Sequence, residues 1–532
     1  MKRVLSFLFC CVLLLMSMTA KVLHHIDNPK YVGINDGTIN LVSVKTTEKS
    51  TILTFRYSGE GFGGFSTESY LSDEAGRRYR LIGHKGFSVA DSSYLKVGRK
   101  GTYRLEFEPL PAGTKVFDFI ENFFYPHATF FYGIREAGTP MLVSQVVEST
   151  EEFSFPDIDF KPDSVWIHGY ITDYDTARYQ FTDVEQFLFG GELTGNDSPI
   201  VRVEPDGSFV LPLKIYGPTW THLNLHSNKH FIDYLVPVML YPGDHIELRI
   251  SDIDKAEWNI WYTSRMGKEY SNLMHCIPPM CLKMIVVGNL QEVKQDSIRY
   301  EGWTPELIDQ QFDSYDTLAS YLTGKYALNN VEAAMLRGEL TNSLARDVLI
   351  ATNNYLASKH PIHKDREEWI KQESPYYSCL SRVYAESNAY LAIPSWQHLQ
   401  ASFIRNAMPR LSYVKEQYWQ SMGNRFYDLP IAKTKEEMDE QLYQVIRAYR
   451  QPKGDDVIFE QAVRFNLLGD APYWIYDTGK VTETMTMIHE LYNYQRSQLT
   501  HPSFVRIAND VITTFEEKHY QEVECHMRGH KE

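Results

Sequence analysis

The chain has 532 residues, which is too long for one hydrophobic core, so we expect two to four domains. Hydrophobic residues make up 43% and charged residues 23%, a composition typical of folded proteins that excludes extensive disorder. The formal net charge of -15 at pH 7 repels phosphate backbones, so nucleic acid is excluded as an expected partner.

Residues 1–20 have the pattern of an export signal peptide. Lys2 and Arg3 supply positive charge, and an uninterrupted apolar run follows over residues 7–16. This run is shorter than the roughly 20 apolar residues with which a helix spans a bilayer. We therefore expect cleavage near Lys21 and an exported mature protein without a stable membrane span.

Residues 21–147 are expected to form an antiparallel β-sandwich-like domain. Alternating apolar segments such as Thr51–Tyr57 and Tyr103–Phe107 are separated by Gly, Asp and Ser, as in antiparallel sheets. The apolar runs Val116–Ile120 and Phe130–Ile134 are expected to pair with each other.

The acidic, proline-containing stretch 148–162 is expected to be a linker. A second antiparallel β-sandwich-like domain is expected over residues 163–255, with strands at Val165–Ile171, Phe209–Leu213 and His245–Ile250. The fold class predicted from these two regions and from the helices that follow is multidomain β plus α.

Two turns are expected inside the second β domain. Pro205–Ser208 contains Gly207, and Tyr241–Asp244 places Pro242 and Gly243 at the central positions of a turn. Proline has the φ angle that the first central position needs, and glycine accepts a positive φ at the second.

Residues 256–532 are expected to form a mostly α-helical domain. Apolar residues recur there at intervals of three and four, as in Val331–Leu356, Trp396–Met408 and Val505–Phe515. No repeat with a fixed period is present in the sequence, so the spacing does not indicate a solenoid.

The run Phe107–Pro111, followed by Phe117–Glu121 and Tyr132–Ile134, resembles the N-terminal extension of exported thioredoxin-like disulfide reductases of Gram-negative bacteria. The second domain, with Gly207–Phe209 and Pro242–Asp244 before its last strand, is similar to the β domain that often comes next in that group. The resemblance implies an exported protein, periplasmic or at the cell surface of a Gram-negative bacterium.

The resemblance covers roughly residues 28–255 and does not extend to the family's chemistry. Those reductases use a Cys-x-x-Cys pair in a C-terminal thioredoxin fold, where a low-pKa thiolate is the nucleophile. This chain contains no such pair. The resemblance therefore implies a non-catalytic extension without a cofactor, acting on a protein partner at the cell envelope.

Cys276 and Cys281 form the closest cysteine pair of the expected mature chain. A regular helix would separate them by about 7.5 Å along its axis, but Pro278 and Pro279 should bend the chain between them. The pair is a candidate disulfide, because exported compartments favour oxidation; the other structural interpretation is two buried thiols. A second functional hypothesis is a thiol-disulfide oxidoreductase or isomerase that uses these two cysteines.

A third hypothesis is a glycan-binding protein, because aromatic side chains can stack on sugars, although they can also fill β-rich cores. The tryptophans to inspect first are Trp166, Trp220, Trp258 and Trp261. No catalytic residue and no metal site is predicted. His489 and Glu490 lack the second histidine of a zinc-protease helix, and Cys525, His526 and His530 lie in a tail that is expected to fray.

Overall fold

The computed structural model describes about half of the chain, and the described residues belong to two compact units. The first unit comprises Met1–Ser144, Asp254–Glu257 and Met284–Gln295, and the second comprises the remainder. The predicted signal peptide and linker lie outside the described residues. The described residues are 21–35, 38–58, 63–89, 94–97, 100–122, 124, 128–140, 163–177, 179, 181–186, 200–227, 232–253, 258–263, 271–276, 286–287, 304–359, 374–383, 389–393, 395–396, 399, 460–465, 486, 489, 493–509, 517, 520–521 and 524–525.

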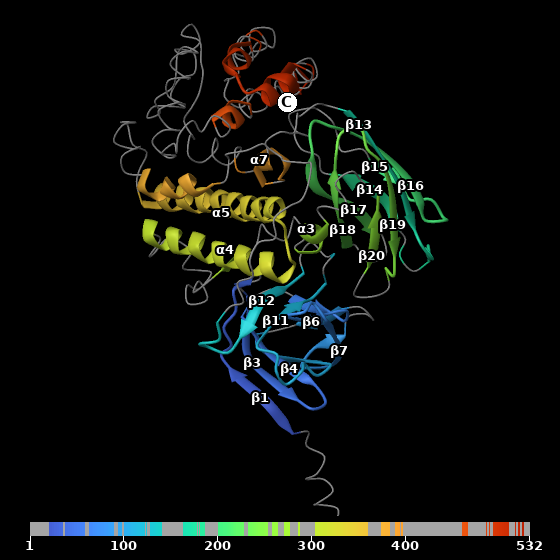
Figure 1. Cartoon of the computed structure of the whole chain (residues 1–532), viewed down its shortest axis with the longest axis vertical. Helices are drawn as coiled ribbons and strands as arrows, with labels where there is room; N and C mark the ends of the chain where they lie inside the picture. The colour runs from blue at the N-terminus through green and yellow to red at the C-terminus, as the bar shows by residue number, and fades with distance from the viewer. Residues whose placement is uncertain are drawn as a thin grey trace, which may run out of the picture. The chain divides into compact units, whose positions relative to one another are not determined.

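The first unit is built on a ten-stranded, antiparallel sheet that forms a half-barrel (Figure 1). A separate sheet has three short strands, in the order β5 (Gly63–Ser66), β9 (Tyr94–Val97) and β8 (Ser88–Val89). The large sheet has the order β1 (Val22–Asp27), β3 (Ile39–Thr47), β4 (Thr51–Tyr57), β10 (Gly101–Phe107), β7 (Arg78–Lys85), β6 (Tyr70–Asp73), β11 (Val116–Ile120), β12 (Phe130–Arg135), β2 (Gly33–Ile34) and β21 (Val286–Val287).

One strand, β7, joins the two halves of this sheet. Its first three residues pair with β6, and its later residues pair with β10. Opposite Glu106 and Phe107, β7 contains the additional residue Ile82 between Leu81 and Gly83. Such a bulge bends a strand and increases its twist, so the sheet continues around a corner. The expectation of two separate, facing sheets is therefore corrected to one continuous sheet that curves around its core.

Phenylalanine side chains fill the concave side of the half-barrel. Phe119 is fully buried, and its ring centroid lies 5.4 Å from that of Phe55, 5.5 Å from Phe65 and 6.1 Å from Phe131. Burying each ring contributes about 1.5–3 kcal/mol relative to exposure. These contacts connect β4, β5, β11 and β12, so one core stabilises both halves of the sheet.

The second unit begins with two four-stranded sheets. The first has the order β16 (Ser208–Ile215), β13 (Asp163–Ile171), β19 (His245–Ser251) and β20 (Asn259–Tyr262). The second has the order β15 (Ile200–Arg202), β14 (Phe181–Gln186), β17 (Thr219–Ser227) and β18 (Ile232–Leu240). The sequence predicted an antiparallel arrangement for this region, and the first sheet departs from it because β13 and β19 run parallel. Strand β20 continues this sheet past residue 255, where the sequence predicted the helical domain to begin.

Apart from β21, which lies between α3 and α4 in the chain, the strands precede the helices, so the predicted order of β and α regions is confirmed for the described residues. Helix α4 (Pro305–Lys325) starts at Thr304, whose hydroxyl accepts a hydrogen bond from the Leu307 amide at 3.3 Å. It packs against α5 (Asn330–Lys359). Three shorter helical segments are α3 (Ser271–Cys276), the 3-10 helix η4 (Ser374–Arg382) and α7 (Ala389–Ala392). Since α3 contacts β18 and α7 contacts β17, helices cover the second sheet of this unit.

Candidate functional site

Strict alternation along β13 separates an apolar face from an exposed face of the first sheet in the second unit. Val165, Ile167 and Ile171 are buried, whereas Trp166 and Tyr170 are exposed. The same period-2 pattern is present in β16 and β19. We call the exposed side the aromatic face; its residues are Ser164, Trp166, His168, Tyr170, Ser208, Val210, Pro212, Lys214, His245, Glu247, Arg249, Ser251, Asn259, Trp261 and Thr263.

Three aromatic rings dominate this face. Trp166 is 40% exposed, Tyr170 is 44% exposed and Trp261 is 51% exposed. Large aromatic side chains are usually buried in a folded protein, so three exposed rings on one sheet face are unusual. The only other large hydrophobic residue exposed on this face, among the described residues, is Val210.

The strand register places polar side chains between the rings. Trp166 of β13 is the Cα partner of Pro212 on β16 and of His245 on β19. Four residues further along β13, Tyr170 is the partner of Arg249 on β19.

Arg249 is in turn the partner of Trp261 on β20, so Tyr170, Arg249 and Trp261 form one row across three adjacent strands. The Arg249 guanidinium lies over the Trp261 ring, with its central carbon 5.5 Å from the ring centroid. This cation–π contact contributes about 0.5–1 kcal/mol at an exposed site and restricts the arginine side chain. Arg249 therefore has one aromatic residue on each neighbouring strand, Tyr170 on β13 and Trp261 on β20.

The buried side of the same sheet is closely packed, which fixes the strands that carry the aromatic face. Gly169 and Phe209 are register partners on β13 and β16, and the Phe209 ring occupies the space where a Cβ at position 169 would lie. On β20, Tyr262 points the other way from Trp261, and its hydroxyl bonds to the Met239 backbone of β18. Burial raises the pKa of this Tyr262 hydroxyl. The two sheets are thus in contact, and the residues that flank Trp166, Tyr170 and Trp261 are anchored in a packed interior.

The structure divides the four tryptophans singled out from the sequence into two pairs. Trp166 and Trp261 are on the aromatic face. Trp220 is completely buried on β17, and Trp258 is buried with its ring 4.9 Å from that of Tyr234. These two are core residues and are removed from the candidate set. Tyr170 was not singled out from the sequence. It lies four residues after Trp166 on the same strand, so strand alternation predicts that both side chains are on the same face.

The candidate disulfide is described only in part. Cys276 ends α3 and is buried, whereas Cys281 lies outside the described residues. The Leu273 amide, one turn earlier in α3, donates a hydrogen bond of 2.9 Å to the buried Glu332 carboxylate. Cys276 therefore lies on a helix that is tied to the start of α5, and the pairing with Cys281 stays a prediction.

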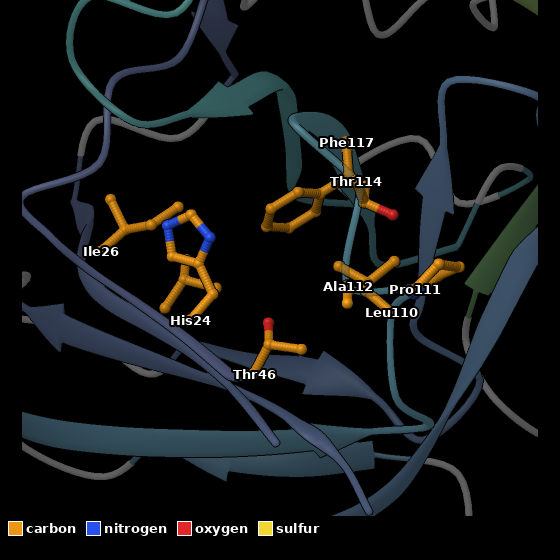
Figure 2. Close-up of a pocket in the computed structure, with 9 residues that line it drawn as sticks. His24, Ile26, Thr46, Leu110, Pro111, Ala112, Thr114 and Phe117 are labelled. Carbon is orange, nitrogen blue, oxygen red and sulfur yellow. The ribbon is translucent and has the colours of Figure 1, made fainter. Parts of the chain in front are cut away.

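A small hollow lies at the edge of the half-barrel, where His24 and Thr46 face the loop before Phe117 (Figure 2). Its volume of about 20 Å³ is enough for a water molecule and far below the roughly 300 Å³ of the smallest ordinary ligand pockets. His24 Nε2 is 3.5 Å from a Glu136 carboxylate oxygen, and both side chains are well exposed to solvent. This hollow is too small to be a substrate site.

The helical part contains several buried polar side chains. Glu339 and Asn342 lie one turn apart on α5, and Glu339 Oε2 accepts a hydrogen bond of 2.8 Å from the Ser395 amide. The amide groups of Asn342 and Gln495 are fully buried and have no hydrogen-bond partner in the described part of the chain. No three His, Cys, Asp or Glu side chains among the described residues are placed to hold a metal ion.

Comparison of the chain with protein-family models, curated proteins and solved structures found no match. The resemblance to the extensions of thioredoxin-like reductases therefore stays a prediction. None of the helices in the described ranges is long and apolar enough to cross a bilayer. The aromatic face is the feature of the described structure from which a function can best be inferred.

Proposed function

We propose that this chain is an exported, non-catalytic binding protein, and that it binds a glycan on the aromatic face. The observation that carries the proposal is the alignment of Trp166, Tyr170 and Trp261, all exposed, on one side of one sheet. Keeping these rings in water is unfavourable by about 25 cal/mol per Å² of apolar surface, so a ligand that covers them gains this free energy.

The mixture of side chains favours a glycan over a protein partner on this face. A pyranose ring is amphipathic, with C–H groups on its faces and hydroxyls around its rim. The aromatic face matches that chemistry, because rings alternate with hydrogen-bonding groups such as His168, Glu247 and Asn259. The core of a protein interface would instead be depleted in lysine and glutamate, and this face has both, as Lys214 and Glu247.

The proposal includes a place in the cell and a finer description of the fold. The signal-like N-terminus and the resemblance to extensions of thioredoxin-like reductases support a role in the periplasm or at the surface of a Gram-negative bacterium. We propose two β-rich regions followed by a helical region, in the order in which those extensions have them. A protein partner at the cell envelope is compatible with this role, since the face described above uses only one side of the second unit.

The position of Cys276 does not favour the oxidoreductase hypothesis. A redox-active cysteine must present its thiolate to a substrate disulfide. Cys276 has 1% of its surface exposed, in a helix that contacts β18. The pair Cys276 and Cys281 is therefore proposed as structural.

The proposal is tested by titrating the mature, full-length protein with purified oligosaccharides and measuring heat or intrinsic tryptophan fluorescence. Trp261→Ala is expected to weaken binding by tenfold to a hundredfold, or about 1–3 kcal/mol, the range for aromatic residues at the centre of an interface. Tyr520→Ala is the matched control, because Tyr520 is 47% exposed and lies in the helical region.

Two results would overturn the proposal. One is the absence of binding to every glycan in a panel of neutral, amino and acidic oligosaccharides. The other is binding that Trp166→Ala and Trp261→Ala leave unchanged, since the ligand would then lie elsewhere. Circular dichroism of each variant checks that the sheet is intact, which is expected because both side chains point to solvent.

A further inference from the structure

We infer that the aromatic face selects acidic glycans, and that Arg249 binds the carboxylate of a uronic acid residue. This inference rests on the proposed glycan-binding function and specifies its ligand class. It starts from the row Tyr170, Arg249 and Trp261, in which neighbouring strands place a guanidinium between two exposed rings.

The dimensions of the row suit a sugar chain. Adjacent strands are about 4.8 Å apart, so the backbones at Tyr170 and Trp261 are separated by about 10 Å, with Arg249 midway. Rings at this separation can each cover one sugar, and a charged substituent between the two sugars would meet Arg249. Trp166, four residues before Tyr170 on β13, lies about 13 Å along the strand and extends the surface for a longer chain.

The Arg249 guanidinium is restricted by its neighbour and can bind an anion. The central carbon of its guanidinium lies over the Trp261 ring, 5.5 Å from the ring centroid, and the group has five N–H donors in a fixed fork. In the described part of the chain no carboxylate forms an ion pair with Arg249. An arginine held in one place loses less entropy when it binds, and its fork of donors matches the two oxygens of a carboxylate.

The aromatic face is far less negative than the chain, whose formal net charge is -15. Its two permanent cations, Lys214 and Arg249, are balanced by Glu247 on the face and by Asp206 beside it, whose carboxylate accepts a hydrogen bond of 2.7 Å from the Ser208 hydroxyl. This balance favours an anionic ligand of low charge density.

The low density of cations also favours uronic acids over sulfated glycans. A highly sulfated chain carries more than one negative charge per sugar and needs several cations along its path. On the aromatic face Glu247 precedes Arg249 by two residues on the same strand and would repel such a chain. A chain with one carboxylate for each sugar can place a single carboxylate between the rings of Tyr170 and Trp261, where Arg249 neutralises it.

The test compares a hexamer of galacturonic acid with a neutral glucose hexamer by isothermal titration calorimetry on the full-length mature protein. The wild type is expected to bind the acidic hexamer at least tenfold more tightly, and added salt is expected to weaken only that binding. Arg249→Gln is expected to weaken binding of the acidic hexamer at least tenfold more than it weakens binding of the neutral hexamer. Arg249→Lys keeps the charge but loses the fork, so an intermediate loss is expected.

The matched control is Arg104→Gln, which removes an exposed arginine from β10 of the first unit and is expected to change neither affinity. Equal affinity for both hexamers, or an equal effect of Arg249→Gln on both, would overturn the selectivity and leave glycan binding intact. Tighter binding to a heparin hexamer than to galacturonic acid would overturn the carboxylate assignment. If neither hexamer nor any other glycan binds, the proposed function itself fails.

Discussion

Replacing Gly169 by alanine tests whether the sheet that carries the aromatic face is as tightly packed as its geometry indicates. A Cβ at this position would overlap the Phe209 ring, and three of the ring's atoms would lie closer than van der Waals contact allows. Phe209 has 3% of its surface exposed and lies beside the fully buried Leu211 and Ile167, so a displaced ring has to move within a buried region. Inserting a methyl group into such a core costs about 1–3 kcal/mol.

The assay is urea unfolding followed by tryptophan fluorescence, with a double-mutant cycle. Phe209→Ala alone is expected to cost about 3–5 kcal/mol. In that background Gly169→Ala should cost little, because the ring it overlaps is gone, so the two changes should couple by about 1–3 kcal/mol. Val210→Ala is the control for the same strand, since Val210 is exposed and its truncation should change stability by less than about 0.5 kcal/mol.

Two results would refute this reasoning. If Gly169→Ala changes the free energy of unfolding by less than about 0.5 kcal/mol, the inner side of the sheet is not closely packed at this point. If Gly169→Ala costs the same with and without the Phe209 ring, the cost comes from the backbone and not from the overlap.

Four further outcomes are expected. Phe119→Ala should destabilise the first unit by about 3–5 kcal/mol, measured by urea unfolding, because its fully buried ring contacts rings on both halves of the half-barrel. Thr304→Ala removes the hydroxyl that accepts from the Leu307 amide and should cost about 1 kcal/mol, with fraying at the start of α4 seen by hydrogen exchange. Burial raises the pKa of Glu332 above its ordinary value of 4.5, so the folded state favours the protonated carboxyl; the stability contribution is complete below that value and is lost as the pH rises through the raised pKa. Glu332→Gln should remove this pH dependence, whereas parallel pH profiles of wild type and variant would contradict it. Alkylation of native protein should leave Cys276 unmodified because it is buried, and mass spectrometry of unfolded protein should find the predicted Cys276–Cys281 bond only before reduction.

Local patterns predicted the strands and turns well. Thr51–Tyr57 is β4, and the predicted strand Val165–Ile171 lies within β13. The turn Tyr241–Asp244 is confirmed, because Gly243 has a φ of 83° and the Asp244 amide donates to the Tyr241 carbonyl at 3.1 Å. These features depend on residues a few positions apart, whose alternation and allowed φ angles are visible in the sequence.

In the second unit, local sequence patterns predict the exposure of some residues and fail to predict it for others. The alternation in β13 places Trp166 opposite Val165 and Ile167, so its exposure could have been predicted from the sequence. The same rule fails for β17, which has a polar Thr-Trp-Thr-His sequence and is nevertheless buried on both faces. Trp220 is a core residue because helices cover one side of its sheet and the other sheet covers the opposite side, which no local pattern indicates.

Backbone preferences and hydrophobic periodicity act over short distances, so the positions of many strands, turns and helices could be predicted from the amino-acid sequence. The pairing of the strands is visible only in the folded chain: β13 pairs with β19 in parallel, β2 pairs with β21 across some 250 residues, and β7 has two partners at its bulge. This pairing also places Tyr170, Arg249 and Trp261 in one row. The physical reason is that pairing depends on the burial of surfaces contributed by distant segments, and that burial exists only after the chain has folded.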